Sequence, residues 1–62
     1  MRNSLPQRRA ERAWSQEELA KRVGVSRQTI IAIEKGRFDP RLTLAFRLAD
    51  VLGCRVDDLF EE

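Results

Sequence analysis

The stretch GVSRQTIIAIEKG, residues 24–36, combines two signals for helix ends with a short amphipathic pattern. Gly24 suits the left-handed conformation that ends one helix, and Ser26 is a preferred N-cap residue for the next. At 100° per residue, Ile30 and Ile33 then share one face. The stretch therefore predicts a tight turn followed by a short helix that buries one of its faces.

The opposite face of this predicted helix carries groups that match the edges of base pairs in duplex DNA. It presents Gln28, Ile31, Ala32 and Lys35, with Arg27 beside them at the N-terminal end. Glutamine can pair bidentately with adenine, arginine with guanine, and an apolar side chain can contact the methyl group of thymine. The alternative is a merely solvated face with one exposed isoleucine, which is the ordinary role of a polar helix face.

The segment before the turn predicts another helix, which begins after Ser15. Ser15 and Glu18 have the spacing of a capping box, and Trp14 and Leu19 have the spacing of a hydrophobic staple across the helix start. This helix ends at Gly24, so only a short turn separates it from the helix described above. Two helices joined in this way form a helix-turn-helix unit.

The length and composition of the chain exclude several classes of protein. Its 62 residues suit one small core, and no run approaches the roughly 18–20 apolar residues that span a bilayer. The basic N-terminus lacks the apolar block of a signal peptide. The chain has one cysteine and no histidine, which removes Cys/His zinc sites and histidine-dependent catalysis. We therefore expect a cytoplasmic, nucleoid-associated protein that is not an enzyme and has no metal, cofactor, small-molecule ligand or membrane segment.

Basic side chains are concentrated in the first two thirds of the chain. Residues 1–41 contain ten Lys and Arg against five Asp and Glu, whereas residues 42–62 contain two against five. The resulting balances, +5 and −3, sum to the net charge of +2. This asymmetry favours a polyanion as the partner of the basic part, although a solvated surface of mixed charge has the same composition.

A longer stretch carries a family resemblance. WSQEELAKRVGVSRQTIIAIEKGRFDP, residues 14–40, resembles the DNA-binding domain of the Cro/C1-type phage repressors, also called the XRE family. The similarity continues through LTLAFRLADVLGCRVDDLF, residues 42–60, and points to the short stand-alone regulators of that family. The resemblance implies an all-α, lambda-repressor-like fold of five short helices. Residues 1–62 would form one DNA-binding domain, with the helix-turn-helix at about residues 16–35.

The remaining helices follow from the pattern and from the resemblance. Residues 5–12 are expected to form the first helix, with Pro6 in its first turn. The resemblance implies a fourth helix from about residue 41 or 42 to 52 and a last turn near residues 56–60. Side chains expected in the core are Ala45, Leu48, Ala49 and Leu52 of the fourth helix, the aromatic residues Phe38, Phe46 and Phe60, and Cys54 as a small apolar residue.

Two residues depart from the pattern of the family. Arg8 stands where relatives commonly have a buried leucine, so either the first helix shifts or Arg8 lays its aliphatic stem on the core. Arg41 stands where a capping serine is common, so Asp39 is expected to cap the fourth helix instead.

The resemblance also implies roles for individual side chains. Four residues are expected to contact phosphates and so to fix the register on DNA: Gln16, Thr29, Lys35 and Arg37. Four others are expected to contact the bases and so to read the sequence: Arg27, Gln28, Ile31 and Ala32. Gln16 would also brace the recognition helix. Arg9 and Glu34 stand where many relatives have an ion pair that joins the first helix to the end of the third, a structural role.

Members of the family usually bind palindromic operators as two-fold dimers, with half-sites about one turn, roughly 10 base pairs, apart. A homodimer of this chain would use the fourth and fifth helices, where Leu44, Phe46 and Val51 flank the inward stripe or belong to the core. The resemblance thus predicts a repressor that places residues 27–35 in the major groove of double-stranded DNA. Two alternatives remain open: an antitoxin or controller that acts mainly through a protein partner, and an interaction adaptor that has lost DNA binding.

Overall fold

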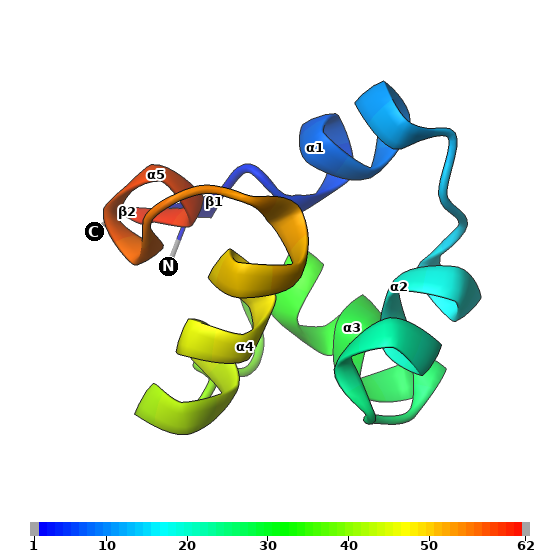
Figure 1. The fold of residues 1–62 in the computed structure, drawn as a ribbon. Helices are drawn as coiled ribbons and strands as arrows, with labels where there is room; N and C mark the ends of the chain where they lie inside the picture. The colour runs from blue at the N-terminus through cyan, green and yellow to red at the C-terminus, as the bar shows by residue number, and fades with distance from the viewer. Residues whose placement is uncertain (1, 62) are drawn as a thin grey trace.

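A computed structural model describes residues 2–61, which form five helices and one short pair of strands (Figure 1). In chain order the elements are β1 (Arg2–Asn3), α1 (Leu5–Arg12), α2 (Gln16–Val23), α3 (Arg27–Glu34), α4 (Leu42–Leu52), α5 (Val56–Leu59) and β2 (Phe60–Glu61). The predicted five-helix fold and the predicted helix ranges are confirmed. Within the described residues, no helix is both long enough and apolar enough to cross a membrane.

The core is built from aliphatic side chains that come from all five helices. The buried apolar residues are Leu5, Leu19, Ala20, Val23, Ile30, Ile33, Ala45, Leu48, Ala49, Leu52 and Leu59. The inward stripe predicted for α4 is therefore confirmed, and so are the two isoleucines predicted to bury one face of α3. One face of α3 is therefore buried in the core. This burial fixes the orientation of the opposite face of the helix.

Two of the three phenylalanines predicted for the core lie on the surface. Phe38 is 44% exposed and Phe46 is 57% exposed, so the prediction is wrong for both, while Phe60 is half-buried and packs against the core. The reason is that aliphatic side chains already fill the interior. Leu48 and Leu52 of α4 are fully buried, and Phe46 lies on the flank of the stripe to which they belong. Cys54 is half-buried against the core, close to its predicted role.

Local hydrogen bonds explain where the central helices begin and end. The Ser15 hydroxyl accepts from the backbone N–H of Glu18 at 3.0 Å, and the Ser26 hydroxyl accepts from that of Thr29 at 3.2 Å. Gly24 ends α2 with a φ of +87°, in the left-handed region that favours glycine. Only half of the predicted capping box forms, because the Glu18 carboxylate accepts from Arg22 Nε at 2.7 Å instead.

The two departures from the family pattern have simple structural outcomes. Arg8 is half-buried and its Nε donates to the Ser4 hydroxyl at 3.4 Å, while Leu5 fills the core from α1. Asp39 does not cap α4: the N-cap residue is Arg41, and no side-chain hydrogen bond is made there. The first residues of α4 are exposed, so water can satisfy their N–H groups without a capping side chain.

The sequence did not predict the antiparallel pair of β1 and β2. Arg2 pairs with Glu61 and Asn3 with Phe60, so segments from opposite ends of the chain lie side by side (Figure 1). The Ser4 backbone N–H extends this contact by donating to the carbonyl of Leu59 at 2.9 Å. Two-residue strands are too short to produce an alternating pattern, so no local signal announces them.

Candidate DNA-binding surface

The turn between α2 and α3 leaves the start of α3 on the surface. Ile30 and Ile33 pack into the core together with Leu19 and Val23 of α2, which fixes α3 against α2. The first residues of α3 point away from this contact and are exposed. A helix N-terminus held in this way presents free N–H groups and a partial positive charge to solvent.

The structure gathers seven of the eight predicted site residues on α3 or just after it. Arg27, Gln28, Lys35 and Arg37 are exposed, whereas Thr29, Ile31 and Ala32 are half-buried on the same short helix. The eighth residue, Gln16, is the first residue of α2 and is half-buried. Seven of the eight residues therefore lie along α3 and the residues just after it, and they provide polar, cationic and apolar side chains.

Among residues 2–61, the side chains of Arg27, Gln28, Lys35 and Arg37 form no hydrogen bond or ion pair. They are free to contact a ligand without first breaking an internal bond. Thr29 differs, because its hydroxyl lies 3.0 Å from the Ser26 hydroxyl within the cap of α3. A phosphate contact by Thr29 would share that hydroxyl with the cap.

Other cations of the chain are used to hold the fold. Arg47 Nη1 donates to the carbonyl of Val23 at 2.8 Å and so caps the end of α2, and Arg12 donates to the carbonyl of Leu52 at the end of α4. Arg22 pairs with Glu18 and lies over the Trp14 ring, 4.1 Å from its centroid. Fewer cationic side chains are therefore free to bond a partner than the basic composition suggests.

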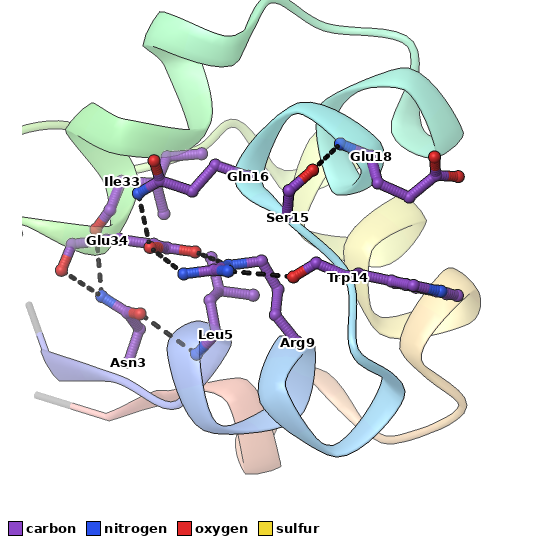
Figure 2. Close-up of polar contacts among 9 residues, drawn as sticks. All are labelled: Asn3, Leu5, Arg9, Trp14, Ser15, Gln16, Glu18, Ile33 and Glu34. Carbon is purple, nitrogen blue, oxygen red and sulfur yellow. Dashed lines mark hydrogen bonds and ion pairs between the residues drawn. The ribbon is translucent and has the colours of Figure 1, made fainter.

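A polar cluster lies behind the end of α3 and ties it to α1 and α2 (Figure 2). Arg9 donates to both carboxylate oxygens of Glu34, from Nε at 2.6 Å and from Nη2 at 3.0 Å, so the predicted ion pair is confirmed. Gln16 Nε2 donates to Oε1 of the same carboxylate at 3.0 Å. Gln16 thus braces the end of α3 through Glu34.

Sequence reasoning missed one residue of this cluster. The Asn3 side-chain amide donates to the carbonyls of Ile33 and Glu34 at 3.0 and 3.3 Å (Figure 2). Asn3 lies thirty residues before these partners, and no motif or periodicity connects it with them. Asn3 belongs to β1, which pairs with β2 and lies against α3.

The described residues also contain no group of three or more His, Cys, Asp or Glu side chains able to hold a metal ion. Every buried side-chain nitrogen or oxygen atom in this part of the chain has a hydrogen-bond partner. The polar interior is therefore fully used for structure, and the unpaired polar side chains of the predicted site lie on the α3 surface.

Comparisons with known proteins agree with this geometry. A helix-turn-helix family model matches residues 7–59. An uncharacterised helix-turn-helix-type transcriptional regulator of Methanocaldococcus jannaschii is 55% identical over 60 residues, which cover 97% of this chain and 91% of that protein. A transcriptional repressor of the cryptic phage CTXphi in Vibrio cholerae is 37% identical over 54 residues, covering 87% of this chain and 49% of the repressor.

A solved structure has the same arrangement of helices. The crystal structure of a hypothetical transcription factor from Neisseria, NHTF, matches with a TM-score of 0.78 and 33% sequence identity. The match covers 84% of this chain and 58% of the Neisseria chain. This chain therefore spans somewhat more than half of that protein.

Proposed function

Because the chain belongs to the helix-turn-helix family of Cro/C1-type DNA-binding transcriptional regulators, we propose that it is a sequence-specific repressor with α3 as its recognition helix. The proposal is carried by the set of unpaired side chains on α3 and just after it. Arg27, Gln28, Lys35 and Arg37 are exposed and form no bond within residues 2–61, while the opposite face of the helix is packed into the core. An adaptor that had lost DNA binding would have no reason to keep this cationic surface.

The side chains divide into two kinds of contact. Arg27 and Gln28 at the start of α3 have the donors and acceptors that read guanine and adenine, and the half-buried Ile31 and Ala32 beside them suit the methyl group of thymine. Phosphate contacts fall to Lys35 and Arg37 at the end of the helix, to Thr29, and to the amide hydrogen of Gln16 that Glu34 does not take. The N-terminus of α3 adds an attraction for phosphate.

A homodimer on a palindromic operator is the second part of the proposal. Among the residues predicted for the interface, Leu44 and Val51 pack against the core, whereas Phe46 is exposed, as is Leu42 one turn earlier at 68%. Phe46 also lines a groove whose rim carries Asp50, Arg55 and Asp57, charges of both signs. A two-fold interface needs a self-complementary surface of this kind.

The remaining features of the proposal concern the protein as a whole. Residues 1–62 act as one DNA-binding domain in the cytoplasm, at the nucleoid. DNA binding requires no cofactor, metal or small-molecule ligand. The protein has no enzyme activity. An antitoxin or controller that acts through a protein partner would use the exposed α4 surface in place of a second copy.

Replacing Gln28 with alanine is expected to reduce sequence preference by relaxing it at one base pair, whereas replacing Lys35 with alanine weakens binding to every sequence. Loss of a bidentate base contact costs roughly 1–3 kcal/mol at one base pair. Loss of a phosphate contact leaves the preference intact and lowers the salt slope by about one. The measurement is fluorescence anisotropy at several salt concentrations. It compares a duplex that the wild-type protein selects from a random pool with a scrambled duplex.

Gln7→Ala is the matched control, because Gln7 is an exposed glutamine on α1. It is expected to leave both affinity and preference unchanged. An unchanged preference in Gln28→Ala would remove Gln28 from the reading surface. Failure of the wild-type protein to bind any duplex at low salt would contradict DNA binding and favour a protein partner.

A further inference from the structure

Asn3 contacts the recognition helix from outside the helix-turn-helix unit. Its Nδ2 donates to the carbonyl of Ile33 at 3.0 Å and to that of Glu34 at 3.3 Å, while its Oδ1 accepts from the backbone N–H of Leu5 at 3.2 Å. One short side chain thus joins the end of α3 to the start of α1, as Figure 2 shows.

The contact completes the C-terminal cap of α3. The last four carbonyls of a helix lack partners within the helix. Here three of these carbonyls accept from backbone N–H groups at 3.0 Å: that of Ile31 from Lys35, that of Ile33 from Gly36 and that of Ala32 from Arg37. Gly36 has a φ of +74°. This pattern is a Schellman motif. The motif leaves the Glu34 carbonyl without a backbone partner. Among the described residues, this carbonyl accepts only from Asn3.

Asn3 is itself held firmly in place. It pairs with Phe60 of β2, which directly follows α5. The next residue, Ser4, donates from its backbone N–H to the Leu59 carbonyl and from its hydroxyl to the Asp58 carbonyl, both at 2.9 Å. The amide that holds α3 is therefore anchored to the other end of the chain, independently of the α2–α3 turn.

We propose that Asn3 is a positioning residue for DNA recognition, which sets the tilt of α3 in the groove by holding its C-terminal carbonyls. The role rests on the proposed function of α3. A helix of eight residues is about 12 Å long, so a tilt of about 5° about its N-terminal turn moves its other end by about 1 Å. A hydrogen bond of ordinary length does not survive a displacement of that size. Ile31, Ala32 and Lys35, nearest the held end, move most.

Two substitutions separate the contact with α3 from the contact with α1. Asn3→Ser keeps an oxygen that can accept from the Leu5 N–H in the same local turn, but its side chain is one atom shorter and lacks the amide Nδ2 that reaches the carbonyls of α3. Asn3→Asp keeps the shape of the side chain and places a carboxylate oxygen against the carbonyls of α3, where the helix dipole is unfavourable to negative charge. Ser4→Ala is the matched control, because it removes a hydrogen bond between the same segment and α5 without touching α3.

The measured quantity is the ratio of affinities for the selected duplex and for a scrambled duplex. Anisotropy is recorded at a temperature where circular dichroism shows each variant to be folded. The ratio is expected to fall about tenfold in Asn3→Ser, equivalent to one misplaced base contact, and further in Asn3→Asp. Affinity for the scrambled duplex stays within about twofold of wild type, because the cationic side chains that bind phosphate are all retained.

The outcomes separate this role from the proposed function. A wild-type protein with no preference for the selected duplex would refute the proposed function itself. A wild-type preference that survives both Asn3 substitutions would overturn the positioning role, as would an equal fall in Ser4→Ala. If neither Asn3 variant folds, the side chain is required for the fold as a whole, and a specific role in recognition is likewise overturned.

Discussion

Replacing Arg9 with methionine is expected to lower the free energy of unfolding by about 3 kcal/mol, because it leaves the Glu34 carboxylate buried without its cation. The Glu34 side chain is only 6% exposed and that of Arg9 is 17% exposed. A domain of 62 residues has roughly 3–9 kcal/mol of stability in total, and the loss corresponds to a fall in Tm of roughly 10–25 °C. Thermal and urea unfolding followed by circular dichroism measure the effect.

Arg22→Met is the matched control for this prediction. Arg22 Nε meets the Glu18 carboxylate at 2.7 Å, close to the 2.6 Å between Arg9 and Glu34, but both side chains of the second pair are exposed to solvent by more than a third. An exposed pair contributes about 0.2–1 kcal/mol, and the stacking of Arg22 on Trp14 adds about 0.5–1 kcal/mol. Arg22→Met is therefore expected to cost clearly less than Arg9→Met.

A double variant, Arg9→Met with Glu34→Met, tests the cause directly. It removes the buried charge together with its partner, so it is expected to recover part of the stability lost in the single variant. If Arg9→Met costs no more than Arg22→Met, or if the double variant is less stable than Arg9→Met, an unpaired Glu34 carboxylate is not what destabilises the end of α3.

Replacing Phe46 with glutamate is expected to weaken binding to a palindromic operator by about a hundredfold or more, because it would separate the two copies that the proposed dimer places on the two half-sites. Phe46 is 57% exposed in the single chain, so the folded monomer should lose no more than about 0.5 kcal/mol of stability. In a dimer the same position would bury a carboxylate at the interface. Binding to a duplex with a single half-site is expected to stay unchanged.

Thr43→Glu is the matched control for Phe46→Glu. Thr43 is exposed on the same helix, on the face opposite the buried stripe, and receives the same charge. Sedimentation equilibrium is expected to give the mass of a dimer for the wild type and Thr43→Glu and that of a monomer for Phe46→Glu. Wild-type affinity of Phe46→Glu for the palindromic operator would exclude this surface as the interface.

The helix boundaries could be predicted because their signals are local. Ser15 and Ser26 each bond a backbone N–H three residues later, and Gly24 adopts the left-handed conformation by itself, so the ends of α2 and the start of α3 follow from short stretches. The ion pair between Arg9 and Glu34 is different. Its partners are 25 residues apart, and only the resemblance to a known family connected them.

The sequence could predict which side chains share the candidate surface, but not which cationic side chains of the chain are free of internal hydrogen bonds. Periodicity alone placed Gln28 and Lys35 opposite Ile30 and Ile33 on α3. It could not tell that Arg47 and Arg12 cap other helices, because those bonds depend on where α2 and α4 end in space. The internal bonds of the fold decide which cationic side chains are free to contact DNA.

The sequence by itself determined the ends of α2, the start and the buried face of α3, and the composition of the α3 surface, since these depend on residues within one or two turns of each other. The fourth and fifth helices were expected from the resemblance to a known family. The tertiary structure decided that Phe46 is left outside the core and that Asn3 reaches the end of α3. Burial and long-range hydrogen bonding depend on which distant segments meet. For Asn3, the segments that meet are β1, β2 and α3, and two-residue strands carry no pattern of their own.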